Sequence, residues 1–230
     1  MVKDIYISFD IDGTLVCFTE QINVHIKAFQ EAFALLAKPV DDISKVIGEP
    51  IMGWMDKKII MTILKNIGCD YSDEKVQEVM KKTEEIFVHN FTGVPIVPPG
   101  ITKVLDYCVK CPNITIGLAS GNLPGIAWKK IENAGLLQYF PEKIGGFGVV
   151  LDRCSAIKNS RLNAEQITGK KFDKIIHIGD TANDISSAHL AGAQAIAVLT
   201  GQQGQNYEEP CLILNNFEDG YEQFLSFLSQ

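Results

Sequence analysis

The chain has 230 residues, of which 46% are hydrophobic and 21% charged, and its formal net charge is −7. This composition is typical of a folded soluble protein and excludes disordered and collagen-like chains. No apolar stretch reaches the roughly 18 residues that a membrane span requires, and the first residues lack the pattern of a signal peptide, so we expect a cytoplasmic protein. The acidic balance argues against a nucleic-acid binder, which needs a basic face.

The first predicted element is a buried strand that ends in two acids. The run from Ile5 to Phe9 is rich in β-branched and aromatic residues, and the sequence Asp10-Ile-Asp12-Gly-Thr then breaks it with a turn. Ligands of open α/β sheets bind at the carboxyl ends of the strands. Asp10 and Asp12 are therefore candidate functional residues.

After this strand the apolar residues recur every three to four positions, which predicts a long helical region. The expected helices cover 22–36, 41–48, 50–66 and 72–90. Four helices with short connections indicate a small bundle. We predict a helical cap domain at 17–95, inserted into a core domain formed by 1–16 and 96–230. The connections at 16–19 and 92–99 are candidate hinges.

From residue 101 onward, predicted helices and strands alternate. The helices cover 101–110, 123–135, 153–167, 181–191 and 217–228, and the strands cover 113–119, 144–150, 173–178, 194–199 and 211–214. This alternation is typical of a parallel sheet covered on both faces, which the first strand must join. We predict an α/β fold: a doubly wound, Rossmann-like parallel sheet with an inserted α-helical bundle.

Three of the predicted strands end in polar residues at what should be one edge of the sheet. These residues are Asp10 with Asp12, the run Ser120-Gly121-Asn122, and Asp180 with Asp184. Carboxylates gathered in one place raise one another's pKa values, and a divalent cation relieves their repulsion. Because oxygen ligands favour Mg²⁺ over zinc, we predict a magnesium site at Asp10, Asp12, Asp180 and Asp184.

The chain carries, in this order, the segments Phe9-Asp-Ile-Asp-Gly-Thr-Leu15, Ala119-Ser-Gly-Asn122 and Gly179-Asp-Thr-Ala-Asn-Asp184. They resemble the motifs of the haloacid-dehalogenase superfamily of phosphotransferases. The inserted helices resemble the cap of its phosphoglycolate-phosphatase and phosphoglucomutase branch, so the resemblance covers almost the whole chain. The first motif is highly specific, whereas the serine motif alone is weak.

The resemblance implies a role for each acid. Asp10 would be the nucleophile that forms an aspartyl-phosphate, and Asp12 would be the general acid and base. The Asp10 side chain, the backbone carbonyl of Asp12 and Asp180 would hold Mg²⁺. Asp184 would orient the metal site or a cation.

The resemblance also implies groups that bind the phosphoryl moiety. The implied substrate-binding residues are Thr14, Ser120, Gly121 and Asn122, with the Ser120 hydroxyl donating to a phosphoryl oxygen. The family has a lysine at the start of a helix before the last motif, and here the sequence departs from that pattern. Arg153 stands at the helix start and Lys158 lies inside the helix. We favour Arg153, whose guanidinium can clamp a phosphate, and Lys158 remains the alternative.

The predicted function is Mg²⁺-dependent hydrolysis of a small phosphorylated metabolite, with phosphoglycolate-like and sugar phosphates as expected substrates, by a monomer or homodimer. A phosphomutase is the alternative, and a non-enzymatic phospho-acceptor module is a more distant one. Asp12 argues against dehalogenases and phosphonatases, which lack the second acid.

Plainer interpretations stay open for the same residues. The Asp10 to Asp12 turn has the start of a calcium loop but lacks its later acids. Ser120 suits a helix cap, and Asp180 and Asp184 suit the start of a helix.

The cap is expected to select the substrate. Lys27, Lys57 and Lys58 offer donors there, and Trp54 offers an aromatic face. Each of these side chains is more typical of a solvated helix surface than of a ligand site.

Overall fold

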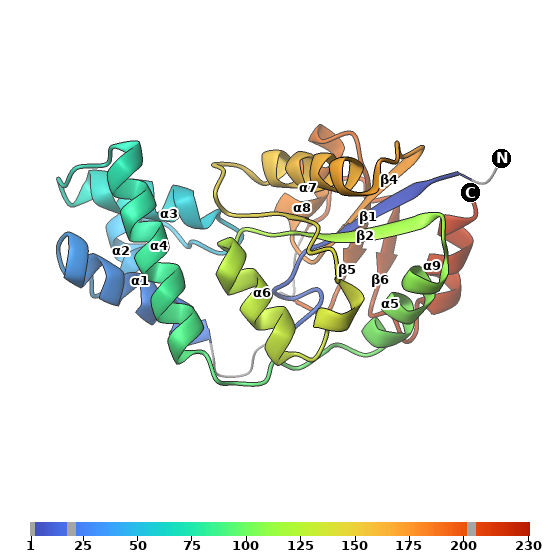
Figure 1. The fold of residues 1–230 in the computed structure, drawn as a ribbon, viewed down its shortest axis with the longest axis horizontal. Coiled ribbons are helices and arrows are strands. Elements are labelled where there is room, and N and C mark those ends of the chain that lie inside the picture. The colour runs from blue at the N-terminus through green and yellow to red at the C-terminus, as the bar shows by residue number, and fades with distance from the viewer. Residues whose placement is uncertain (1–2, 18–21, 202–205) are drawn as a thin grey trace.

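The strands of the computed structural model form a parallel sheet (Figure 1). The structure describes residues 3–17, 22–201 and 206–230. Within these ranges the sheet has six strands in the order β3-β2-β1-β4-β5-β6, and every neighbouring pair is parallel. The strands are β1 (Ile5–Phe9), β2 (Ile114–Ala119), β3 (Gly145–Gly146), β4 (Lys174–Gly179), β5 (Gln194–Val198) and β6 (Leu212–Leu214).

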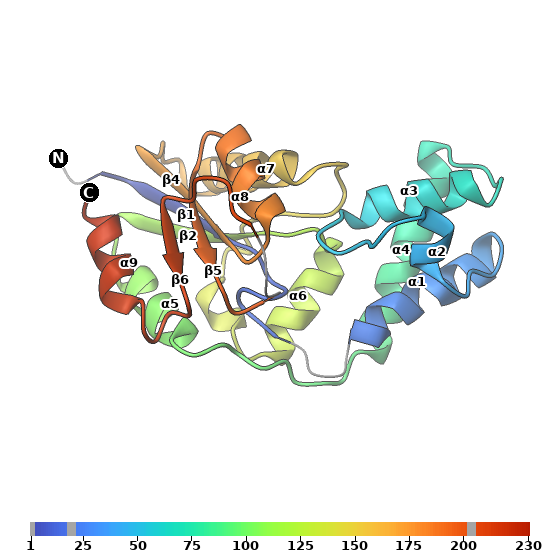
Figure 2. The same cartoon turned by 180° about the vertical axis from the view of Figure 1, so that it is seen from behind.

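Helices cover both faces of this sheet (Figures 1 and 2). One face carries α5 (Ile101–Lys110), α6 (Pro124–Asn133), the short 3-10 helix η1 (Leu137–Tyr139) and α9 (Tyr221–Leu228), and the other carries α7 (Arg153–Thr168) and α8 (Ala182–Leu190). Strand β1 is buried on both sides. Ile7 and Phe9 pack in the cluster that includes α5 and α9, whereas Tyr6 hydrogen bonds to Ser160 of α7. The predicted doubly wound α/β fold is confirmed.

Four helices lie between β1 and α5 and form a bundle at one end of the molecule (Figure 1). They are α1 (Ile22–Leu36), α2 (Ile43–Ile47), α3 (Asp56–Asn66) and α4 (Asp73–Asn90). The bundle has its own hydrophobic cluster, which includes Phe33, Ile60 and Val79. The connections into and out of it lie side by side, because Cys17 and Ile96 exchange two backbone hydrogen bonds of 2.7 and 2.9 Å. The exact domain division at 17–95 stays a prediction, and part of the candidate hinge at 16–19 lies outside the described residues.

Two predicted elements differ most from the structure, and the helix predicted at 217–228 begins only at Tyr221. The helix predicted from residue 50 begins at Asp56, since residues 50–55 form a non-helical loop with Gly53 at a φ of 75°. The strand predicted at 144–150 is reduced to Gly145–Gly146, because the backbone of α7 packs directly on it. A Cβ at Gly146 would overlap the carbonyl oxygen of Ala156. Gly53 permits a left-handed backbone and Gly146 a close approach, and the hydrophobic pattern encodes neither.

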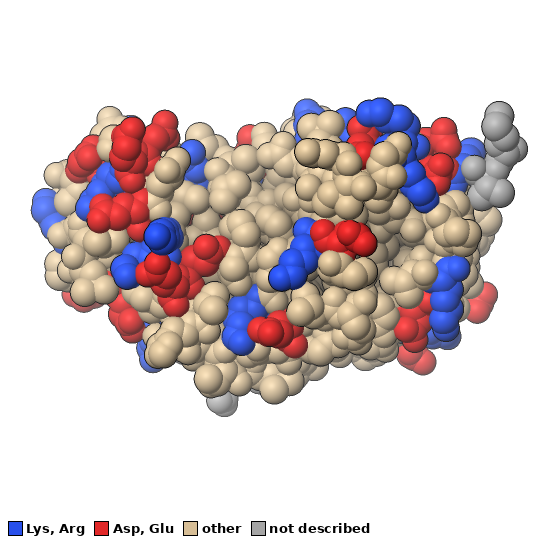
Figure 3. All heavy atoms as spheres, viewed as in Figure 1, with Lys and Arg blue, Asp and Glu red and all other residues tan. Residues whose placement is uncertain are grey.

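Charged side chains of both signs are interspersed over the face shown in Figure 3, where they gather on the bundle and on the outer helices. The centre of this face, between the bundle and the sheet domain, is largely uncharged. Among the described helices, none has the length and apolar character needed to cross a membrane.

Candidate active site

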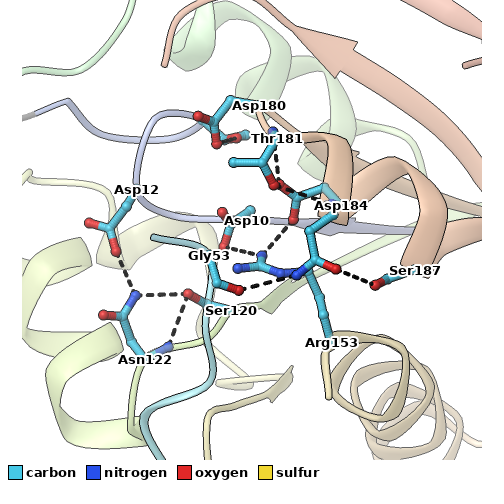
Figure 4. Close-up of polar contacts among 12 residues, drawn as sticks. Asp10, Asp12, Gly53, Ser120, Asn122, Arg153, Asp180, Thr181, Asp184 and Ser187 are labelled. Carbon is cyan, nitrogen blue, oxygen red and sulfur yellow. Dashed lines mark hydrogen bonds and ion pairs between the residues drawn. The ribbon is translucent and has the colours of Figure 1, made fainter. Parts of the chain in front are cut away.

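The three polar strand ends lie together, because β2, β1 and β4 are neighbours in the sheet. Asp10 follows β1 and its backbone N–H donates to the carbonyl of Ile178 on β4 at 2.9 Å. Ser120 follows β2 and Asp180 follows β4 (Figure 4). All three line a cavity of about 620 Å³ between the sheet edge and the helical bundle. Parallel strands thus bring together side chains that are up to 170 positions apart.

Three carboxylates suit a divalent cation. Asp10, Asp180 and Asp184 are buried, and each offers an oxygen within 4.8 Å of the others. The Oδ1 atom of Asp10 is buried and makes no hydrogen bond, although it faces a cation described below. Clustered carboxylates repel one another, a divalent cation relieves this repulsion, and oxygen donors suit Mg²⁺. The side chain of Asp12 does not belong to this group of described residues, so the expected contribution of Asp12 is its backbone carbonyl.

Two glycines and a threonine surround the carboxylate of Asp180. A Cβ at Gly13, which has a φ of 85°, or at Gly201 would overlap that carboxylate. The Thr14 hydroxyl donates to Asp180 Oδ1 at 3.5 Å. Thr14 is fully buried and does not line the cavity. The structure thus places Thr14 behind Asp180, where it helps to hold that carboxylate, and its contact with substrate stays a prediction.

Arg153 links the first and last motifs. Its Nη1 lies 3.0 Å from Asp10 Oδ1 and 2.5 Å from Asp184 Oδ1 (Figure 4). Burial alone would lower the pKa of Arg153, but the two acids outweigh it and raise that pKa. The guanidinium is thus a permanent cation at the bottom of the cavity.

The alternative cation, Lys158, is not at this cavity. Lys158 is exposed and does not line the cavity that contains Asp10. It follows Arg153 by five positions on α7, and five helical residues turn the side chain by about 140° away from the Arg153 direction. The geometry therefore favours Arg153 over Lys158 as the cation of this cavity, and the role of either residue stays a prediction.

Asp184 holds Arg153 and has little capacity left for a metal. Its Oδ2 accepts the Thr181 N–H at 3.0 Å and the Thr181 hydroxyl at 2.5 Å. Its Oδ1 pairs with Arg153 and lies 3.3 Å from His177 Nε2. Burial would raise the pKa of Asp184, but Arg153 and these hydrogen bonds lower it well below the usual range. Of the two roles expected for Asp184, this geometry favours orienting a cation.

Asp12 lies in a different environment from Asp10. Lys130 of α6 points its Nζ at both carboxylate oxygens of Asp12, at distances of 2.8 and 2.7 Å. Asn122 donates its Nδ2 to Asp12 Oδ2 at 2.7 Å and to Ser120 Oγ at 2.8 Å (Figure 4). Ser120 and Asn122, which were both predicted at the site, therefore belong to one hydrogen-bond network with Asp12.

The sequence analysis did not identify Lys130, although it is 4% exposed and lines the cavity. The pair Lys129-Lys130 looks like an ordinary solvated stretch of helix. A signal was present in the helical phase, because Lys130 follows Ile126 by four positions and Ala127 by three, and both are fully buried. A lysine on the apolar stripe of a helix requires a buried acidic partner.

The pKa values of the first two acids move in opposite directions. Burial raises the pKa of Asp10 to about 6, with repulsion from Asp184 and Asp12 adding to it and Arg153 opposing it. Burial also tends to raise the pKa of Asp12, but Lys130 and the hydrogen bond from Asn122 lower it overall. Lys130 and Asn122 therefore favour the ionised form of Asp12, which is the form that accepts a proton.

The helical bundle closes over the sheet edge at two points. The carbonyl of Gly121 accepts the backbone N–H of Asp56 at 2.9 Å, and the carbonyl of Gly148 accepts that of Lys57 at the same distance. A Cβ at Gly121 would come within 2.5 Å of the carbonyl oxygen of Trp54. Gly121 is therefore needed for this close approach of the loop at 50–55.

Two acids of the bundle contact the first turn of α6. Asp56 Oδ2 accepts the Leu123 N–H at 2.7 Å, and Glu84 accepts the Gly125 N–H. His25 of α1 places its Nε2 3.2 Å from the same oxygen of Asp56. His25 and Asp56 both line the cavity, and the sequence analysis assigned neither to the site. Only the fold brings them there, because neither belongs to a local motif.

Comparisons with known proteins agree with this arrangement. The family model for haloacid dehalogenase-like hydrolases matches residues 6–192. A protein of Dickeya dadantii named probable phosphatase IndB is 27% identical over 223 residues, which cover 92% of this chain and 89% of that protein. The phosphoglycolate phosphatase of Aquifex aeolicus is 24% identical over 219 residues, which cover 93% of each chain.

A solved structure shows the same fold. CbbY from Rhodobacter sphaeroides, in complex with phosphate, matches with a TM-score of 0.68 at 19% identity, covering 95% of this chain and 96% of that one. The family model spans most of the chain and includes the ends of β1, β2 and β4. This chain therefore belongs to the haloacid dehalogenase-like hydrolases.

Proposed function

We propose that this protein is a Mg²⁺-dependent phosphatase that hydrolyses a small phosphate monoester through an aspartyl-phosphate on Asp10. One observation carries the proposal: Asp10 and Asp12 line the same cavity as Ser120, Arg153 and Asp180. The names of the relatives, a probable phosphatase and a phosphoglycolate phosphatase, support the same reaction class.

In the first step, a carboxylate oxygen of Asp10 attacks phosphorus. A bond forms between that oxygen and phosphorus, the bond to the leaving oxygen breaks, and Asp12 gives its proton to the departing alkoxide. Arg153, 3.0 Å from Asp10, would neutralise negative charge on the phosphoryl oxygens. Ser120 lines the cavity beside Asp12 and would donate its hydroxyl to one of these oxygens.

In the second step, water attacks phosphorus and the bond to Asp10 breaks. The Asp12 carboxylate, left without its proton by the first step, takes one from the water. Inorganic phosphate leaves, and both acids return to their starting states. The ionised form of Asp12 that Lys130 stabilises is the form needed in this step.

Asp10 and Asp180, with the backbone carbonyl of Asp12, would hold Mg²⁺. When bound, the ion would neutralise charge on the phosphoryl oxygens and on the clustered carboxylates. Asp184 would keep Arg153 in place, as their 2.5 Å ion pair suggests.

The experiment is hydrolysis of a generic aryl phosphate with and without Mg²⁺. We expect Mg²⁺-dependent release of phosphate by the parent protein and a loss of at least about 10³-fold in kcat for Asp10→Asn, because the nucleophile is removed. Asp41→Asn is the matched control, since Asp41 is exposed on the bundle. Residual turnover of Asp10→Asn at the parent rate would refute the assignment of the nucleophile.

A phosphomutase would share the phosphorylated Asp10 but return the phosphoryl group to a sugar. The two functions are separated by supplying glucose 1-phosphate with a bisphosphate activator. Release of inorganic phosphate supports the phosphatase, and accumulation of glucose 6-phosphate would replace it with the mutase.

A further inference from the structure

The cavity has two chemically different halves. The half at the sheet edge carries the carboxylates, Arg153 and Lys130. The opposite half is formed by the helical bundle and by the loop at 50–55, and we call its apolar lining the leaving-group wall. The wall consists of Ile26, Phe29, Ile51, Trp54, Phe87 and Phe91. A phosphoryl group held at Asp10 would direct the rest of its ester toward this wall.

Packed rings form much of the wall. Phe87 and Phe91 stack with their ring centroids 4.7 Å apart, and His25 stacks on Phe29 at 4.9 Å. The Phe87 ring also meets His25 edge-on at 5.5 Å. Stacked rings of this kind form a pre-organised apolar surface. Such a surface gains free energy by covering an apolar or ring-shaped group.

Among the described residues that line the cavity, every lysine and arginine already faces an acid. The carboxylates of Asp10, Asp12, Asp56 and Asp180 line it together with the basic residues Lys130 and Arg153. Lys130 is already paired with Asp12, and Arg153 with Asp10 and Asp184. The Nε2 of His25 lies 3.2 Å from Asp56 Oδ2, so the histidine has an acidic neighbour in the cavity.

Among the described residues of the bundle, no lysine lines the cavity. Lys27 is exposed, Lys57 lies 3.8 Å from Asp73, and Lys58 sits over the Trp54 ring at 3.9 Å, and none of the three lines the cavity. The segments outside the described residues, at 1–2, 18–21 and 202–205, contain no lysine, arginine or histidine in the sequence.

We infer that the preferred substrate is the phosphate monoester of an uncharged alcohol that bears an apolar or ring group. The inference rests on the proposed phosphatase function and narrows its substrate class. A carboxylate or a second phosphate on the alcohol would lose its hydration against the leaving-group wall without gaining a cation. A ring would instead exchange water for ring contacts. The inference departs from the phosphoglycolate-like substrates expected from the sequence, whereas a sugar monophosphate stays within the class because its alcohol is an uncharged ring.

The test compares three esters whose alcohols differ in charge and shape: phosphoglycolate, its neutral amide, and benzyl phosphate. We expect kcat/KM to rise in that order, with benzyl phosphate at least about tenfold above phosphoglycolate, mainly through KM. A kcat/KM for phosphoglycolate equal to or above that for benzyl phosphate would overturn the inference.

Gain of a cation provides a second test. Ile51→Lys places an ammonium at the partly exposed Ile51 of the wall, and Met52→Lys does so at the adjacent exposed position. We expect at least one of them to raise kcat/KM for phosphoglycolate by about fivefold or more and to leave the neutral amide nearly unchanged. Ile51→Met and Met52→Leu are the neutral controls. If both lysine variants leave kcat/KM for phosphoglycolate unchanged, the lack of a cation does not limit the use of this substrate, and the inference fails.

A binding measurement separates this inference from the phosphatase proposal. Benzylphosphonate and phosphonoacetate cannot be hydrolysed, and their binding to Asp10→Asn with Mg²⁺ can be measured by calorimetry. Tighter binding of benzylphosphonate supports the substrate class, even if no ester is turned over. A lack of turnover would refute only the phosphatase proposal. Tighter binding of phosphonoacetate overturns the class while leaving the phosphatase intact.

Discussion

The Nζ of Lys130 lies within 2.8 Å of both carboxylate oxygens of Asp12, the proposed general acid and base. Lys130 is buried on α6, and its Nζ also donates to Asn122 Oδ1 at 2.9 Å. The lysine stabilises the ionised form of Asp12. It thereby favours the step in which Asp12 accepts a proton from water and opposes the step in which Asp12 donates one.

Replacing this lysine should change the pH dependence of the first step. In Lys130→Met the pKa of Asp12 should rise, because the charge that lowers it is removed. The protonated acid then persists to higher pH, so the basic limb of kcat/KM against pH should move up by about one unit or more. Lys129→Met is the control, because Lys129 pairs with Glu132 near the surface. An unmoved basic limb in Lys130→Met would contradict the role assigned to this pair.

Arg153 should be essential both for stability and for activity. Arg153→Met leaves the buried carboxylates of Asp10 and Asp184 without their cation, which should reduce the free energy of unfolding by about 3 to 5 kcal/mol at neutral pH. Arg153→Lys keeps the charge but loses the planar fork, so it should fold well and lose about 10-fold to 100-fold in kcat.

Lys158→Met is the natural comparison for these variants and should match the parent in both measurements. Urea unfolding gives the stability, and phosphate release gives the rate. A loss of activity in Lys158→Met, together with normal activity in Arg153→Lys, would return Lys158 to the site.

Asp10 should destabilise the metal-free protein at neutral pH. Its pKa is raised from 3.8 to about 6 on folding, so between these values the folded state binds more protons than the unfolded state. The stability that protonated Asp10 contributes at low pH is therefore lost as the pH rises through this window. Asp10→Asn should be more stable than the parent by roughly 2 to 3 kcal/mol at pH 7, with the difference vanishing near pH 4.

Urea unfolding without Mg²⁺ at the two pH values measures this difference. Adding Mg²⁺ at pH 7 should stabilise the parent more than Asp10→Asn, because the ion binds the ionised carboxylate. An equal response of both proteins to Mg²⁺ would show that Asp10 is not a ligand.

Gly121 should control the approach of the bundle to the site. A Cβ in Gly121→Ala would meet the carbonyl oxygen of Trp54 and displace the loop at 50–55, which also borders the leaving-group wall. We expect kcat/KM to fall at least about tenfold, with KM rising, since the cavity no longer closes correctly. Steady-state kinetics on the aryl phosphate would check this, and an unchanged KM would show that the loop does not shape the cavity.

The sheet and its three polar ends were predictable because they depend on local pattern and on one general rule. Strands β1, β2 and β4 are short apolar runs, and each of these runs stops at an acid or a serine. Parallel pairing then brings Asp10, Ser120 and Asp180 to one edge. Arg153 and Lys158 are five positions apart on one helix, so the helical turn points them in different directions. Choosing between them also required knowing where α7 begins.

The other half of the cavity was not predictable in this way. Lys130, Asp56 and His25 come from three different helices, and the distance between them depends on how the bundle packs. The loop at 50–55 was predicted as helix because its apolar residues fit a helical period. Ile51 and Trp54 line the cavity and also pack against the hydrophobic cluster of the bundle, so their burial does not require a helix.

The contacts of Asp56 and Glu84 with the start of α6 bear on how this protein could be recombined with its relatives. Backbone N–H groups in the first turn of that helix have their acceptors in a different part of the chain. In a chimaera whose foreign bundle lacks acids at these two places, these N–H groups would lose their acceptors. The same helix carries Lys130, so a graft intended to change specificity would also disturb the proton transfers of Asp12.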